Sequence, residues 1–382
     1  MKTNLIPGFA TREATERYTQ TFGKNCAEGH YSDFINLHLK LSSIGLGTFP
    51  GAATDEVDGQ YAEIISKGLQ NGINVIDTGA HYRYGRSLGA VGMGLRKAFE
   101  AGVSREELFL VSKGGFLTFK EGPPQDMAAW FDAEIVKKNL GNLDDLTQAH
   151  LLNPRYIAFQ LELSRQAMGV ETLDAFLIDQ PEVHIPRIGK EMLNKKLEQI
   201  FVVLEQAVKD GRIRYYGIST FSGFRVETDD KLFQSITSLQ GLAERAAKIV
   251  QGDVMAKHHF KVVQMPFNQV MLEGFTRFSQ TTGQGNIAGT FQAAHQLKVY
   301  LMASHTMFKG HLATQCTDTV LQSMSQLKNH AQRALQFNRS TPGLGTTLVG
   351  VSTPSHLEDV LEVAKMMPIE KTAYLKMYQR TE

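Results

Sequence analysis

The chain has 382 residues, of which 42% are hydrophobic and 21% are charged, values that are ordinary for a globular protein. With 40 basic and 39 acidic residues its net charge is +1, so neither nucleic acid nor an anionic membrane is expected as a partner. Two distant cysteines, Cys26 and Cys316, form no disulfide framework, and the absence of a signal peptide or a long apolar run predicts a cytoplasmic location.

Residues 1–40 are polar, carry scattered aromatic side chains and show no clear period. They predict an N-terminal extension packed on the outside of a main domain that spans 41–382. In that domain, short apolar segments alternate with amphipathic ones. The segments expected as strands are 43–47, 74–77, 108–113, 175–179, 214–219, 261–264, 299–304 and 347–351. The segments expected as helices are 62–70, 91–101, 157–168, 197–209, 239–250, 290–296 and 324–337, with one more after Pro354.

Eight strand–helix units predict a single α/β domain folded as a closed (β/α)8 TIM barrel. A doubly wound open sheet would show the same alternation. The glycine cluster from Gly89 to Gly94 lies inside a helical segment and not at a turn out of a strand, so it does not match the dinucleotide fingerprint of that fold. We interpret the cluster as a site of close helix packing.

Two intervals, 114–154 and 269–289, are longer than a strand–helix unit needs. Each follows a strand, so both are expected on the C-terminal face of the barrel, where barrel enzymes build their sites. Their aromatic and apolar side chains indicate a substrate that is a small, partly apolar molecule. The residues expected to wall its pocket from these loops are Phe116, Trp130, Met271 and Phe275.

A strand buried on both faces is predicted at 73–76, and it stops at Asp77. Tyr82 follows five residues later, close enough to fold back beside the carboxylate. An acid and a phenol at the tip of a parallel strand are a candidate pair for proton transfer. The alternative interpretation is that Asp77 caps the loop and Tyr82 is an aromatic residue at its rim.

Five motifs occur in order along the chain. They are IGLGTF at 44–49, GINVIDTGAHY at 72–82, LFLVSK at 108–113, DGRIRYYGIS at 210–219 and VVQMPFN at 262–268. The ordered set resembles that of the aldo-keto reductase family and extends from about residue 41 to residue 361. The resemblance implies an enzyme that transfers a hydride from NADP(H) or NAD(H) to a carbonyl group.

The resemblance also assigns catalytic roles. Tyr82 would be the general acid that protonates the substrate oxygen, Lys113 its electrostatic partner, and Asp77 the carboxylate behind the lysine. A phenol with a pKa of about 10 is a weak acid at neutral pH, and a neighbouring ammonium lowers its pKa. His81, next to Tyr82, is expected in the substrate pocket.

Asp179 is the most informative departure from the family pattern, because relatives have a hydrogen-bond-donating histidine two positions before Pro181. An ionised carboxylate cannot donate. A protonated Asp179 could donate instead, which would suit reduction of a conjugated carbon–carbon double bond. Alternatively, His81 or His184 takes over the role. The third alternative is a cofactor-binding accessory protein with little or no turnover.

For the cofactor, the resemblance implies that Ser219 and Gln264 hold the nicotinamide amide. Relatives carry a lysine or arginine in the turn that starts at Gly350, where this chain has Ser352, so a weaker preference for NADPH and possible use of NADH are expected. The full set of expected cofactor residues is Gly47, Thr48, Asp77, Ser219, Gln264, Ser304, Thr306, Gly310, Leu312, Gly350, Ser352, Thr353, His356 and Asp359.

Two further features lead to no assignment. Leu88 replaces a glutamate that is common in relatives, and no physical consequence follows from the sequence. His258 and His259 lack a third ligand at a defined spacing, so no metal site is expected. The substrate and the oligomeric state stay open.

Overall fold

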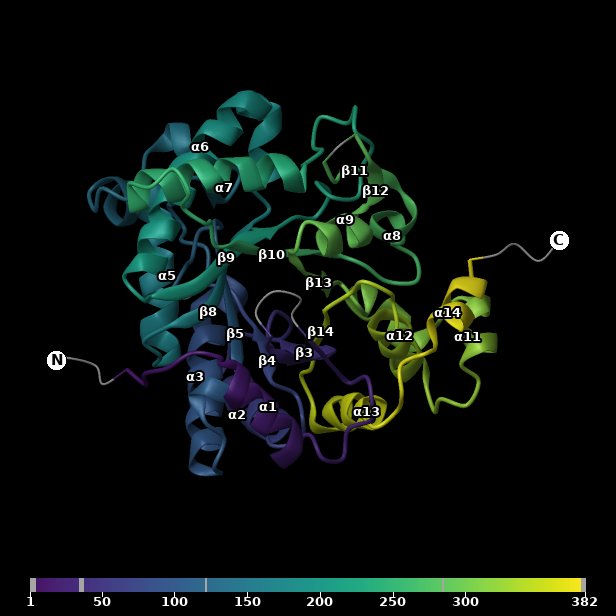
Figure 1. Cartoon of the computed structure of the whole chain (residues 1–382). Helices are drawn as coiled ribbons and strands as arrows, with labels where there is room; N and C mark the ends of the chain where they lie inside the picture. The colour runs from purple at the N-terminus through teal and green to yellow at the C-terminus, as the bar shows by residue number, and fades with distance from the viewer. Residues whose placement is uncertain (1–4, 34–37, 121, 284, 379–382) are drawn as a thin grey trace.

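A computed structural model of the chain describes residues 5–33, 38–120, 122–283 and 285–378. Its centre is a closed barrel of eight parallel strands, with the last strand pairing with the first (Figure 1). The barrel strands are β3 (Ile44–Gly47), β4 (Val75–Asp77), β5 (Phe109–Gly114), β8 (Leu173–Asp179), β9 (Ile213–Ser219), β10 (Phe260–Pro266), β13 (Tyr300–Ser304) and β14 (Thr346–Gly350). The predicted (β/α)8 barrel is therefore confirmed.

Helices surround the barrel and cover its outer face (Figure 1). They are α2 (Asp55–Leu69), α3 (Arg86–Glu100), α5 (Pro154–Met168), α6 (Ile185–Lys209), α7 (Ile236–Gln251), α9 (Thr290–Gln296), α12 (His330–Arg339) and α13 (Pro354–Ala364). Most of the predicted helices begin at a different residue in the structure. The helix predicted at 197–209 begins at Ile185, with a break at Gly189. The helix predicted at 324–337 begins after Asn329, whose side chain accepts from the backbone N–H of Gln332 and caps it.

The glycine cluster serves helix packing, as predicted. A Cβ at Gly92 would lie 2.7 Å from the backbone oxygen of Ala167 in α5, and one at Gly94 would lie 2.8 Å from Ile65 in α2. Any larger side chain would push α3 away from both neighbours. The glycines therefore hold α3 close to α2 and α5.

The N-terminal end of the barrel is covered by α1 (Arg12–Thr21) and by an antiparallel hairpin of β1 (Tyr31–Asp33) and β2 (Lys40–Ser42). Leu39 and Leu41 pack in one cluster with residues that point into the barrel. Asn74 connects hairpin and barrel: its amide oxygen accepts from the backbone N–H of Ser42 at 2.9 Å, and its amide nitrogen donates to the carbonyl of Lys40 at 2.8 Å.

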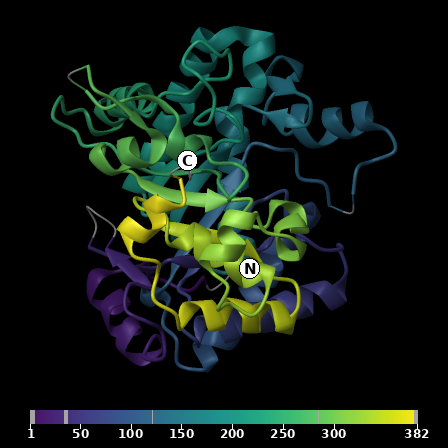
Figure 2. The same cartoon turned by 90° about the vertical axis from the view of Figure 1, so that its right-hand side faces the viewer.

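The two long intervals contain small elements of their own. The first holds α4 (Met127–Phe131) and a hairpin of β6 (Leu146–Thr147) and β7 (His150–Leu151), and around α4 it projects from the barrel (Figure 2). The second holds α8 (Glu273–Thr276) and a hairpin of β11 (Phe278–Thr281) and β12 (Ile287–Gly289). The remaining helices are α10 (His311–Thr314), α11 (Asp318–Ser323) and α14 (Lys371–Lys376). Within the described residues, no helix has the length and hydropathy needed to cross a membrane.

Candidate active site

Polar residues end the barrel strands at one face. Because all eight strands are parallel, their C-terminal ends meet at the same rim, and side chains far apart in sequence become neighbours there. The polar residues at or next to these ends are Asp77, Lys113, Asp179, Ser219, Gln264 and Ser304. A cavity of about 720 Å³ opens at this rim, and all of these except Lys113 line it.

Lys113 lies behind the cavity wall and joins Asp77 to Tyr82. Its Nζ lies 2.6 and 2.5 Å from the two carboxylate oxygens of Asp77 and donates to the Tyr82 Oη at 3.0 Å. The lysine is fully buried, whereas Tyr82 reaches the cavity with 9% of its surface exposed. Since the lysine donates to the phenol oxygen, the phenol proton is free to point at a ligand.

Burial and charge act in opposite directions on these groups. Burial raises the pKa of Tyr82, and Lys113 only partly offsets the rise. Burial opposes the ammonium of Lys113, but the charges of Asp77, Tyr82 and Asp179 raise its pKa above the usual value. Burial also raises the pKa of Asp77, although the ammonium 2.5 Å away keeps it a carboxylate. At neutral pH the site thus holds a carboxylate, an ammonium and a protonated phenol.

The turn that presents Tyr82 is conformationally unusual. Arg83 and Tyr84 follow it with φ angles of 50° and 58°, a left-handed conformation that side chains other than glycine seldom adopt. The guanidinium of Arg83 holds the turn by donating to the backbone oxygen of Ala52 at 2.8 Å and to the Asp58 carboxylate at 2.6 Å. The sequence analysis missed this anchor, because the contact depends on a separate loop.

The backbone at Asp179 is held by two buried histidines. The Nε2 of His150 lies 2.7 Å from the carbonyl oxygen of Asp179, which can only accept, so this nitrogen carries the proton. The Nδ1 of His150 then accepts from the Nε2 of His184 at 2.9 Å, and the Nδ1 of His184 accepts from the Thr147 hydroxyl at 2.9 Å. All four ring nitrogens are engaged, and neither ring borders the cavity. The side chain of Asp179 faces the cavity, and burial raises its pKa.

A groove runs from these residues toward the N-terminus of α13. Twelve of the fourteen expected cofactor residues border it: Gly47, Thr48, Asp77, Ser219, Gln264, Ser304, Thr306, Gly310, Gly350, Ser352, His356 and Asp359. Two do not. Leu312 is buried in the hydrophobic core, and Thr353 caps α13 by accepting from the backbone N–H of His356. Gly310 has a φ of 95° and open space where a Cβ would lie, so the backbone there is accessible to a ligand.

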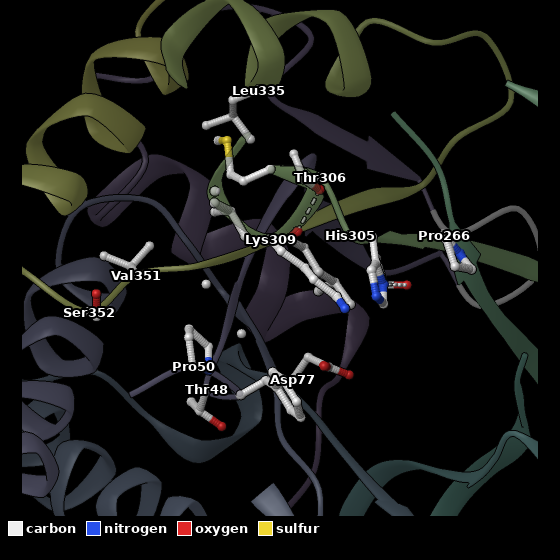
Figure 3. Close-up of a pocket in the computed structure, with 18 of the residues that line it drawn as sticks. Thr48, Pro50, Asp77, Pro266, His305, Thr306, Lys309, Leu335, Val351 and Ser352 are labelled. Atoms are coloured by element: carbon white, nitrogen blue, oxygen red, sulfur yellow. Dashed lines mark hydrogen bonds between the residues drawn. The ribbon is translucent and has the colours of Figure 1, made fainter. Parts of the chain in front are cut away.

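Thr220 and Lys309 also border the groove, and the sequence analysis did not select them. The hydroxyl of Thr220 is buried and has no hydrogen-bond partner among the described residues. Its position directly after Ser219, an expected cofactor residue at the end of a strand, would have indicated Thr220. Among the described residues that border the groove, Lys309, next to Gly310, is the one lysine or arginine. Its side chain extends between Ser352 and His305 (Figure 3).

Of the expected pocket walls, His81 borders the cavity and the four loop residues lie elsewhere. Trp130 packs on Phe119 in a small separate cluster, with ring centroids 4.9 Å apart. Phe275 packs on Phe291 and Tyr374 beside the main core. Trp130 thus packs mainly within its own interval and Phe275 on residues of α9 and α14, and neither side chain borders the cavity.

The other two loop residues lie nearer to the site without bordering the cavity. Met271 is buried, in a turn where its backbone bridges to Asn268. Phe116 lies behind His81, with ring centroids 5.0 Å apart. The exposed ring of Phe49, the last residue of the motif at 44–49 but not among the expected site residues, borders the cavity and packs on Tyr82, with ring centroids 5.0 Å apart.

Known proteins resemble this chain in sequence. The profile of the aldo/keto reductase family matches residues 43–378. The putative voltage-gated potassium channel subunit beta of Schizosaccharomyces pombe is 21% identical over 86% of this chain and 86% of its own length. Glyoxal reductase of Bacillus subtilis is 27% identical, over 51% of this chain and 52% of its own.

Solved structures share the fold. An aldo/keto reductase of Klebsiella pneumoniae, determined with NADP and acetate, has a TM-score of 0.57 and 16% identity over 91% of this chain and 94% of its own. The holo form of an aldo-keto reductase from Bacillus halodurans has the same TM-score at 15% identity, over 91% and 95% of the two chains.

Proposed function

This chain belongs to the aldo/keto reductase family, and from that premise we propose that it is an NAD(P)H-dependent enzyme that reduces an aldehyde or ketone, with Tyr82 as proton donor. The observation that carries the proposal is the contact of Lys113 with both Asp77 and the Tyr82 hydroxyl at the edge of a cavity. The two free cysteines suit a cytoplasmic enzyme.

The reduction adds a hydride to the carbonyl carbon and a proton to its oxygen. The bound nicotinamide nucleotide supplies the hydride. Tyr82 gives its proton to the oxygen as negative charge develops there, and the buried ammonium of Lys113 stabilises the phenolate that remains. The raised pKa of Tyr82 is compatible with this step, because an alkoxide is a stronger base than a phenolate. Solvent then reprotonates Tyr82.

The groove fits a dinucleotide by the chemistry of its donors. Thr220 offers a buried hydroxyl without a partner among the described residues, and Gly310 offers accessible backbone. At the α13 end, the residues that would meet a 2′-phosphate are Ser352 and His356, and Asp359 already accepts from Asn329 and Gln332. Without an arginine there, we propose that NADH competes with NADPH.

A second candidate activity is reduction of a conjugated carbon–carbon double bond. It is favoured by burial at Asp179, which raises the pKa of the carboxyl group and so favours its protonated, hydrogen-bond-donating form. The accessory-protein alternative is represented among the similar proteins by the putative potassium channel subunit of fission yeast. The complete set of Asp77, Tyr82 and Lys113 argues against it, since binding alone does not need a proton donor.

The test is consumption of NADPH and NADH with aldehydes, ketones and enones, followed by identification of the product. An alcohol from a simple aldehyde or ketone supports the main proposal, whereas a saturated carbonyl from an enone supports the second candidate. If purified wild-type protein oxidises neither cofactor with any member of the panel, the reductase assignment is abandoned.

A further inference from the structure

His81 has unused hydrogen-bonding capacity beside the proton donor. Its ring lies 4.8 Å from the Tyr82 ring, and the residue borders the cavity. Its Nδ1 is buried with no hydrogen-bond partner among the described residues, and its Nε2 lies 3.6 Å from the Oδ2 of Asp179. Such a ring at the wall of a cavity is a candidate ligand contact.

Gln264, Ser219 and Lys113, the polar side chains linked to Asp77 and Tyr82, are already engaged. The amide nitrogen of Gln264 donates to Asp77 at 3.0 Å, and the Ser219 hydroxyl donates to Gln264 at 3.3 Å. Lys113 is bound to Asp77 and Tyr82. A carbonyl oxygen placed to receive the Tyr82 proton therefore needs its second hydrogen bond from another group.

We propose that the imidazole of His81, oriented by the Asp179 carboxylate, donates that second hydrogen bond from its Nε2 to the substrate carbonyl. The inference rests on the proposed reductase function. It also gives Asp179 a positioning role: the residue holds an imidazole that comes from the loop after β4.

The tautomer follows from the surroundings of the two ring nitrogens. A neutral imidazole carries one proton, and the ionised form of Asp179 beside Nε2 can only accept, so in that form it favours the proton on that nitrogen. Nδ1 is buried without a hydrogen-bond partner among the described residues. The 3.6 Å separation from Asp179 is longer than a hydrogen bond, so the Nε2 proton remains free for a ligand oxygen.

Burial, and then the charge of Lys113, lower the pKa of His81 to about 3, which keeps the ring neutral at neutral pH. A neutral imidazole can polarise a carbonyl without adding a charge next to Lys113. His150 and His184 cannot substitute for it, because their four ring nitrogens are engaged with one another, Thr147 and the Asp179 backbone.

The main test removes the imidazole at position 81 and then introduces one at position 179. His81→Phe keeps a ring against Phe116 but removes the donor, and we expect kcat/KM to fall about 100-fold with the dissociation constant of the cofactor unchanged. Asp179→His in the His81→Phe background places an imidazole on β8, and we expect it to recover at least tenfold of that loss. Asp179→Asn should cost less than His81→Phe, because the donor stays in place.

Two measurements do not depend on turnover. Nitrogen-15 NMR of the wild-type protein should show His81 protonated at Nε2. Benzamide, whose carbonyl accepts a hydrogen bond but is not reduced, should bind the protein–cofactor complex about tenfold more weakly after His81→Phe.

The inference is overturned if His81→Phe retains kcat/KM within threefold of wild type, if benzamide binds both proteins equally, or if the proton resides on Nδ1. Activity lost in Asp179→Asn but kept in His81→Phe would assign the donor role to Asp179 itself. If the wild type shows no turnover but benzamide binding still depends on His81, the reductase proposal fails and the hydrogen-bond role of His81 stands.

Discussion

Two buried ion pairs lie at opposite ends of the barrel and have nearly the same local geometry. At the N-terminal end, Arg105 lies 2.7 Å from Asp174, and both side chains are 1% exposed. At the C-terminal end, Lys113 lies 2.5 Å from Asp77, with side-chain exposures of 0% and 6%. Burial and ion pairing alone thus do not distinguish a structural pair from a candidate catalytic one.

The difference lies in the partners that surround each pair. The Asp174 carboxylate accepts from the backbone N–H groups of Ala10 and Leu110, and Arg105 donates to the carbonyls of Leu108 and Thr172, so backbone encloses that pair.

The Lys113–Asp77 pair is instead contacted by the side chains of Tyr82 and Gln264, and it reaches a cavity. A buried charge becomes available for chemistry when a proton-carrying side chain links it to accessible space.

The largest expected effect comes from removing that link. Tyr82→Phe should lower kcat by about 10²–10⁴-fold, because the proton donor is lost, with little change in stability. Tyr18→Phe is the matched control: this buried tyrosine donates to the backbone oxygens of Leu69 and Ile73, so its loss should cost about 1 kcal/mol of stability and leave kcat unchanged. Steady-state kinetics and urea unfolding measure both. A Tyr82→Phe protein with more than a tenth of wild-type kcat would contradict the assignment.

Breaking either ion pair should cost stability, whereas only one should cost activity. Lys113→Met and Arg105→Met each leave a buried carboxylate unpaired, which typically destabilises by about 3–5 kcal/mol. Adding Asp77→Asn to Lys113→Met should restore much of that stability and none of the activity. The measurements are urea unfolding and kcat per folded molecule. If Arg105→Met lowered kcat per folded molecule as much as Lys113→Met, the distinction between the two pairs would fail.

A smaller effect is expected at the far end of the groove. Ser352→Arg supplies a guanidinium where a 2′-phosphate would lie, and a hydrogen bond to a charged group contributes about 1.5–3 kcal/mol. NADPH should therefore bind roughly tenfold tighter or more, with NADH binding unchanged. Ser352→Gln, of similar length but neutral, should change neither, as fluorescence titration would show. If the wild-type protein already binds NADPH far more tightly than NADH, the expected weak preference for NADPH is wrong.

The smallest effect is the loss of stability in mild acid, between pH 7 and pH 5.5, which should weaken both ends alike. Burial is the main cause that lowers the pKa of His30, near the N-terminal hairpin, and of His150, at the active face, each to about 3. Below the unfolded value of 6.5 the unfolded chain takes up protons that the folded chain does not. Stability should therefore fall with pH between about 6.5 and 3, by roughly 1 kcal/mol per pH unit for each histidine.

His30→Gln should make this loss shallower, as urea unfolding at pH 7 and pH 5.5 would measure. If the pH dependence of stability were unchanged, His30 would take up its proton as readily in the folded protein as in the unfolded chain.

The sequence by itself predicted eight strand–helix units, and its family resemblance selected Asp77, Lys113, Asp179, Ser219 and Gln264, which meet at one rim of the barrel. Buried parallel strands must be apolar along their length, and in a closed barrel their last residues all point to the same end, so local pattern and site position are coupled. The same coupling explains why most of the cofactor residues that the family resemblance implied lie in the groove, since many of them follow strand ends.

Tertiary structure alone decided what the long loops do. Trp130 packs in a small separate cluster and Phe275 beside the main core, and His150 and His184 form a chain that holds the backbone of Asp179. A loop side chain takes its direction from contacts with residues distant in sequence, and no local period encodes those contacts. The choice between His81 and His184 as a free donor also depended on tertiary structure, because the hydrogen-bond partners of a histidine come from residues that only folding brings next to it.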